Sequence, residues 1–229
     1  MLSISDPTQS FLVHKLINGT YRLSQSFDSR LSITITIINR ILVCIPSVIL
    51  TKYAQCLFRA LYLFACSAFA RIGGLVVVRD GDTSKVIQLA DVSFSSENKK
   101  IHEVNVCFKQ FKHNTKGIHK TITFSHGETS ILAVTVLVNY LGIRQSSQGP
   151  LFLFQDGRPM SRSYFDKSLH KCLAFCDLDS SRYKGHSFRI GAVLFAAEKG
   201  MSDAQARSMG RWNSNAFHKY IRSNHVFPI

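Results

Sequence analysis

Two short segments in the C-terminal part of the chain gather residues whose types and spacing suit chemistry on a phosphate. They are residues 184–192 and residues 209–222. In the first segment, His186 and Arg189 lie three residues apart at an expected helix start, so both project from the same end of one helix face. Helix N-termini favour anions, because unpaired backbone N–H groups and the helix dipole point outward there. By itself, however, such a pair is more often a surface pair that hydrogen-bonds to solvent or backbone.

The second segment combines aromatic and cationic side chains. Trp212 is the only tryptophan of the chain, and Tyr220 follows it. Each has an ordinary structural explanation, as a core anchor whose indole N–H reaches a carbonyl and as an aromatic on an amphipathic helix. Aromatic residues buried only for packing do not need neighbouring cations such as Arg211, Lys219 and Arg222. The grouping therefore favours an anion site.

The composition predicts one folded, strongly basic domain. The chain has 229 residues, of which 45% are hydrophobic and 18% are charged, and this balance is typical of globular proteins. Lys and Arg number 28 against 14 Asp and Glu, which leaves a formal net charge of +14. Such a surplus indicates a polyanionic partner. Nucleic acid is favoured over an anionic membrane, since the sequence has no basic amphipathic helix or polybasic run.

Cysteine usage predicts a reducing, intracellular compartment. Six cysteines are scattered through a chain that has no basic-then-apolar leader, so we expect free thiols. Cys172, Cys176 and His170 could suggest zinc, but no second cluster has zinc-finger spacing, and buried helical thiols with no metal are favoured. The apolar run of residues 60–70 is far shorter than the ~20 residues of a membrane span. It predicts a core helix, and no membrane partner.

The first half of the chain predicts two long helices followed by β structure. Residues 32–50 favour a helix broken at Pro46, and residues 53–71 form the strongest, almost fully apolar helix, which we place at the centre of the core. A short β run is expected at residues 75–78. Residues 104–108 and 121–124 predict a hairpin.

The second half predicts helices with clear start and stop signals. We expect a helix over residues 129–141 and another that begins after Ser161. Three short helices then follow: residues 187–200, a helix opened by the capping box of residues 202–205, and a last one through Tyr220.

The hairpin region is rich in lysine. A charge run of this kind is often only a solvated face, but lysines on a protruding ribbon also contact phosphate backbones, and the two alternatives weigh about evenly. Glu103 is the single acid among these lysines: Lys99, Lys100, Lys109, Lys112, Lys116 and Lys120.

Five blocks in this order resemble the catalytic domain of tyrosine recombinases of the phage-integrase type. The blocks are residues 70–75, the lysine-bearing residues 111–114, residues 185–192, residues 210–212, and Tyr220. The sequences of residues 185–192 and 210–222 are similar to those of recombinases of eukaryotic mobile elements, of the Crypton and DIRS-like kinds, and of their host-captured relatives. The resemblance implies an α+β, mainly helical catalytic domain with a small antiparallel sheet over residues 53–229. Residues 1–52 are then an N-terminal helix and linker, the remnant of a core-binding domain.

The resemblance also implies an activity, which is DNA strand cleavage and rejoining by a site-specific recombinase or integrase without metal or cofactor. Tyr220 is then the nucleophile that forms a 3′-phosphotyrosyl link, and Arg71 and Arg189 bind the non-bridging phosphate oxygens. His186 has a proton-transfer or hydrogen-bonding role. Trp212 takes a position where many relatives have histidine.

The same resemblance implies that a hairpin lysine protonates the leaving 5′-oxygen. Lys112 matches this position best and Lys109 is the second choice. The expected partner is double-stranded DNA, bound in the nucleus by a homodimer or homotetramer. The remaining residues expected to contact DNA are Lys109, Lys116, Lys120, Arg211 and Arg222.

Some features depart from the family pattern. Members commonly have an acid directly after the first glycine of the Arg71 block, where this chain has Gly74. Gly74 and the truncated N-terminal part favour an alternative, a catalytically inactive, host-captured DNA-binding protein. The intact motif residues favour the enzyme, and they are Arg71, Lys112, His186, Arg189, Trp212 and Tyr220. A third reading, a basic helical interaction protein, fits the five ordered blocks poorly.

Overall fold

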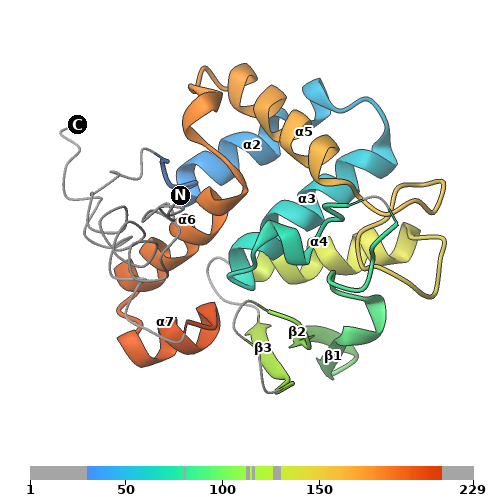
Figure 1. The fold of residues 1–229 in the computed structure, drawn as a ribbon, viewed down its shortest axis with the longest axis vertical. Helices are drawn as coiled ribbons and strands as arrows, with labels where there is room; N and C mark the ends of the chain where they lie inside the picture. Colours follow the sequence, from blue (N-terminus) through green and yellow to red (C-terminus); the bar gives the residue numbers. More distant parts are fainter. Residues whose placement is uncertain (1–29, 80, 112–113, 115–116, 126–129, 213–229) are drawn as a thin grey trace, which may run out of the picture.

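The computed structural model describes residues 30–212, apart from residues 80, 112–113, 115–116 and 126–129 (Figure 1). Helices make up most of this region, and a small three-stranded antiparallel sheet lies at the lower edge of the view in Figure 1. The expected α+β, mainly helical fold class is confirmed.

Helix α3, Lys52–Ser67, lies at the centre of the core, as predicted from its apolar sequence. The Thr51 side chain caps its first turn by accepting a hydrogen bond from the Ala54 N–H. Leu57 and Leu61 are fully buried, and the Tyr62 ring lies 5.3 Å from the Phe188 ring of helix α6. Each fully buried side chain of this size stabilises the fold by about 1.5–3 kcal/mol, so α3 organises the helices packed around it.

Helix α2, Ile35–Val48, contacts both α3 and helix α5, Arg162–Phe175. The predicted break at Pro46 is wrong, because the helix continues to Val48. Pro46 lies in the last turn, where a proline removes one backbone hydrogen bond. The buried side chains of Ile41 and Ile45 hold this turn against the core.

The sheet has the order β1-β2-β3, and all neighbours are antiparallel: β1 is Val92–Glu97, β2 is Lys100–Phe108 and β3 is Lys120–Ser125. The predicted hairpin is confirmed as β2 and β3, with Val106 opposite Ile122. Strand β1 was not predicted, because its three serines weaken the β signal. The Phe124 ring lies 5.8 Å from the Phe64 ring, so the sheet packs on α3.

The β run predicted at residues 75–78 is wrong. The chain forms the 3-10 turn η2, Ile72–Gly74, and then a single bridge between Val77 and Ser161. Leu75 and Val76 are buried. Their apolar character therefore reflects packing in the core and not strand pairing.

The helices expected in the second half are confirmed within the described residues. They are α4, Ser130–Ile143; α5, which begins after Ser161; α6, Gly185–Glu198; and α7, Asp203–Gly210. Helix α7 opens with the predicted capping box, in which the Ser202 and Gln205 side chains each accept from the other residue's N–H. The helix expected through Tyr220 lies outside the described residues.

The six cysteines form no disulfide with one another. Within the described residues, no group of three or more His, Cys, Asp or Glu side chains could hold a metal ion. No described helix is long and apolar enough to cross a membrane.

Candidate active site

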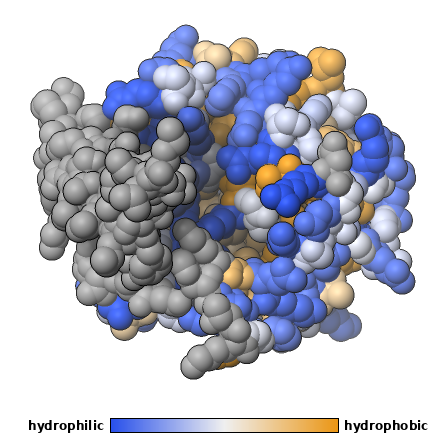
Figure 2. Space-filling view, viewed as in Figure 1, coloured by the Kyte–Doolittle hydropathy of each residue, from blue (hydrophilic) through white to orange (hydrophobic). Residues whose placement is uncertain are grey.

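A cationic pocket of about 640 Å³ lies between η2, the start of α6 and the end of β2. The face drawn in Figure 2 is hollowed near its middle, and hydrophilic residues gather around the hollow. Among the described residues, no acidic side chain lines this pocket, so its positive charge suits an anion. The cationic side chains in its lining are Arg30, Arg71, Lys85, Arg162, Lys184 and Arg211.

Close packing at the start of α6 brings the pocket together. Arg71 stands at the start of η2, and His186 lies in the first turn of α6. A side chain at Gly185 would come within 2.8 Å of the Ile72 Cγ1 atom and 3.1 Å of an Arg162 nitrogen. Since Gly185 has no side chain, the start of α6 can lie directly against η2. Arg71 and His186, far apart in sequence, therefore line one cavity.

Only some of the other predicted site residues line this pocket. Arg211 lines the same pocket as Arg71 and His186, whereas Arg189 and Trp212 do not. Lys120 lies 6.0 Å from the ring of Phe111, which also lines the pocket. The predicted residues that lie outside the described part of the chain are Lys112, Lys116, Tyr220 and Arg222.

Arg189 and Trp212 form a buried stack behind the pocket. Arg189 is 0% exposed, and its guanidinium carbon lies 4.0 Å from the centre of the Trp212 ring. Arg189 Nη1 donates to the Phe69 carbonyl at 2.9 Å, and Nη2 donates to the Gly210 carbonyl. A Cβ atom at Gly210 would lie 1.4 Å from Trp212 Cζ3, so the indole packs directly on the backbone. In this structure both residues hold the end of α7 against the end of α3.

Phe69 adopts a strained backbone two residues before Arg71. Its φ of 47° is in the left-handed region, which costs a non-glycine residue about 1–3 kcal/mol. Its carbonyl accepts hydrogen bonds from Arg189 at 2.9 Å and from Arg211 at 3.1 Å. Hydrogen bonds from charged donors are stronger than neutral ones, and they offset this strain. The backbone that leads into Arg71 is thus held by two arginines.

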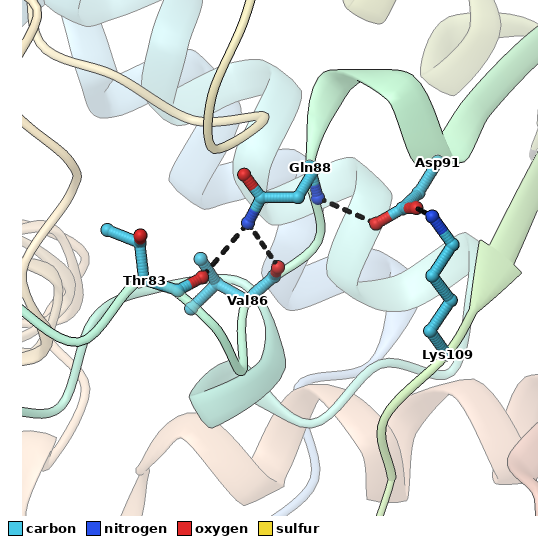
Figure 3. Close-up of polar contacts among 5 residues, drawn as sticks. All are labelled: Thr83, Val86, Gln88, Asp91 and Lys109. Carbon is cyan, nitrogen blue, oxygen red and sulfur yellow. Dashed lines mark hydrogen bonds and ion pairs between the residues drawn. The ribbon is translucent and has the colours of Figure 1, made fainter. Parts of the chain in front are cut away.

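Lys109, the second choice for the hairpin lysine, is paired with an acid at the edge of the sheet (Figure 3). Its Nζ lies 2.6 Å from Asp91 Oδ1, while Asp91 Oδ2 accepts a hydrogen bond from the Gln88 N–H at 3.0 Å. The hydrogen bond with Asp91, and then its charge, raise the pKa of Lys109. The Lys109 side chain is half exposed whereas Asp91 is buried. A DNA phosphate would therefore have to compete with Asp91 for this lysine.

Gly74 leaves room for the acid that the resemblance leads us to expect there. It lines the pocket together with Arg71, and a Cβ atom built on it would meet no atom within 4 Å. The space is open, and no acidic residue of the described lining takes its place.

Four pocket cations were not predicted. Lys184 directly precedes the motif that begins at Gly185, so this neighbourhood could have indicated it. The other three are distant in sequence from every motif, and no local signal marks them. Arg162 pairs with Asp166 at 2.8 Å, and the unpredicted cations in full are Arg30, Lys85, Arg162 and Lys184.

The fold defines a class: the chain has the fold of tyrosine recombinases and integrases. Its structure matches that of the XerH site-specific recombinase bound to a palindromic difH substrate with a TM-score of 0.63 at 13% identity, covering 88% of this chain and 53% of that chain. It also matches the Tn1549 transposon integrase in complex with circular intermediate DNA, with a TM-score of 0.55 at 13% identity over 88% of this chain and 64% of that one.

A lambda integrase dimer bound to a COC' core site matches with a TM-score of 0.53 at 15% identity, covering 87% of this chain and 51% of that chain. At such low identity the likeness concerns the fold. The chain spans about half the length of the XerH and lambda integrase chains. No protein-family model matches the sequence, and no curated protein does.

Proposed function

We propose that this protein is a site-specific recombinase or integrase that cleaves and rejoins double-stranded DNA through a 3′-phosphotyrosyl intermediate. The observation that carries the proposal is the convergence of Arg71 and His186 in one cationic pocket, within a fold shared with DNA-bound tyrosine recombinases. A phosphodiester is an anion that guanidinium groups bind well.

The proposed reaction is a transesterification in which no redox change occurs. The Tyr220 oxygen forms a bond to phosphorus, and the bond from phosphorus to the 5′-oxygen breaks. Arg71 stabilises the charge that develops on the non-bridging oxygens, and His186 donates a hydrogen bond or moves a proton. A hairpin lysine, Lys112 or else Lys109, protonates the departing 5′-oxygen. Rejoining is the reverse reaction with another 5′-hydroxyl.

A second candidate is a host-captured protein that binds DNA without cleaving it. Two observations favour it: Gly74 replaces an acid common in relatives, and Arg189 is fully buried against two backbone carbonyls. For both candidate functions, the amino-acid sequence of residues 185–192 and 210–222 supports an evolutionary relationship to the recombinases of Crypton and DIRS-like elements. We therefore also propose nuclear action, by a homodimer or homotetramer on DNA.

A nicked suicide duplex distinguishes the two candidates. Because the nick lets the strand beyond the cleavage site diffuse away, the catalytic protein should accumulate as a covalent protein–DNA adduct that denaturing gels separate. Tyr220→Phe should give none. Tyr164→Phe is the matched control, since Tyr164 lies on α5 and does not line the cationic pocket. If the wild-type protein binds the duplex but gives no adduct, the second candidate is favoured.

A further inference from the structure

Arg211 is an almost completely buried arginine at the end of α7. It is 3% exposed, and its guanidinium carbon lies 3.7 Å from the centre of the Phe108 ring. Arg211 Nη1 donates to the Ala68 carbonyl at 3.2 Å and to the Met209 carbonyl at 3.1 Å, and Nη2 donates to the Phe69 carbonyl at 3.1 Å. The side chain is therefore held in one orientation.

Not every N–H donor of the Arg211 guanidinium has an acceptor among the described residues. A guanidinium carries five N–H donors, and the carbonyls use both protons of Nη1 and one of Nη2. The Nε atom is buried and has no hydrogen-bond partner among the described residues. A buried donor of a charged group that lacks an acceptor is costly, and an acceptor supplied by a ligand would relieve this cost. Arg211 lines the cationic pocket, which is where such an acceptor can enter.

No acidic residue in the described part of the chain compensates the charge of Arg211. Burial, and to a lesser extent the neighbouring charge of Arg71, lower the pKa of the Arg211 guanidinium to about 9. At neutral pH the group therefore remains protonated, and two positive charges face one pocket that no described acid lines. An anion between them would remove the repulsion and restore part of the lost solvation.

Arg189 differs from Arg211 in what it faces. Both share the Phe69 carbonyl, but Arg189 stacks on Trp212 and is absent from the pocket lining. A guanidinium enclosed in this way cannot reach an anion in the pocket without leaving its carbonyl partners.

We propose that Arg211 and Arg71 are the guanidinium pair that binds the phosphate in this pocket, while Arg189 acts as a positioning residue that fixes the carbonyls holding Arg211. The inference rests on the proposed function for the identity of the phosphate as a DNA phosphodiester. The anion site itself follows from the geometry of Arg211.

Inorganic phosphate is the probe that tests the anion site separately from strand cleavage. Titrating the full chain at constant ionic strength and neutral pH, with chemical shifts or thermal stability as readout, gives an apparent affinity for each variant. Arg211→Lys keeps a charge but lacks the planar fork, so it should bind phosphate about tenfold or more weakly, as expected for the loss of a charge-assisted hydrogen bond. Arg211→Gln should bind more weakly still.

Two further variants make the test decisive. Arg158→Gln removes an exposed arginine that pairs with Asp156 and does not line the pocket, so its phosphate affinity should equal that of the wild type. Arg189→Lys should lower thermal stability, and its folded fraction should retain phosphate binding within about threefold. If Arg211→Gln does not fold, Arg211→Lys decides the test.

Wild-type phosphate affinity in Arg211→Lys would overturn the proposal, and so would a loss of affinity in Arg189→Lys larger than that in Arg211→Lys. The proposed function fails differently. In that case the wild-type protein forms no adduct on a suicide duplex, yet inorganic phosphate still binds and still depends on Arg211.

Discussion

A guanidinium can bind a phosphate only where its N–H edge is accessible, and this decides the roles of the two C-terminal arginines. Arg189 directs its terminal nitrogens at the carbonyls of Phe69 and Gly210 and lies over Trp212. Arg211 also donates to backbone carbonyls, but it lines the pocket together with Arg71. Two residues of the same type thus differ in function because their neighbours differ.

The packing of Trp212 on Gly210 gives a residue-scale prediction. Gly210→Ala should lower the free energy of unfolding by about 1–3 kcal/mol, because the added methyl displaces the indole from Arg189. Gly74→Ala is the matched control at an open position, and it should change the free energy by less than about 1 kcal/mol. Denaturant titration of both variants measures this, and equal stabilities would contradict the close packing of Trp212 on Gly210.

The site depends on three elements that meet at their ends: η2 carries Arg71, the first turn of α6 carries His186, and β2 ends at the pocket. Helix α6 also packs closely on the segment before α2, where a Cβ at Gly191 would lie 1.9 Å from the Ile33 carbonyl oxygen. Small residues at these contacts let the backbones approach. The end of β2 is held in another way. Lys109, the residue that directly follows β2, forms an ion pair with Asp91.

This ion pair gives an element-scale prediction. Asp91→Asn keeps an oxygen that can accept from the Gln88 N–H but removes the charge that holds Lys109. Stability should change by no more than about 1 kcal/mol, because Lys109 is half exposed. The released lysine should add a phosphate contact, so duplex DNA binding should tighten and its dependence on salt should steepen by about one unit in the log–log slope.

Asp156→Asn is the control for this prediction. It also removes one negative charge and releases an exposed arginine, Arg158, but neither residue lines the cationic pocket. Binding measured over a range of salt concentrations should change less in this variant. An identical effect of the two substitutions would assign the gain to net charge and not to Lys109.

At the scale of the whole molecule, a formal net charge of +14 on 229 residues provides the long-range attraction for a polyanion. If the proposed function holds, this attraction steers the chain to DNA before any contact forms.

The whole-molecule prediction concerns salt. The logarithm of the DNA affinity should fall steeply and linearly with the logarithm of the salt concentration. Lys112→Ala and Lys116→Ala should each weaken binding and reduce the slope by about one. Lys171→Ala is the control, because α5 lies at the opposite edge of the view from the sheet (Figure 1). Binding that is insensitive to salt would contradict a phosphate interface.

Local sequence determined much of the fold. The capping residues Ser161 and Ser202 began helices where predicted, and the apolar pattern of α3 indicated its central position, because caps and periodicity act over a few residues. Strand β1 and the continuation of α2 past Pro46 were not predicted, since packing against the core outweighed weak local preferences there. Motif order also indicated Arg71 and His186 as partners in one site.

Only the tertiary structure decided which arginine faces the pocket. Arg189 and Arg211 both lie in motifs that predict phosphate chemistry, and nothing in their spacing separates them. The two arginines share the Phe69 carbonyl, and the difference arises at the aromatic rings beside them. The Trp212 ring lies against Arg189, whereas the Phe108 ring, which lines the pocket, lies against Arg211. The acceptors and rings that enclose one guanidinium and leave the other facing a cavity come from distant segments, so their effect exists only once the chain has folded.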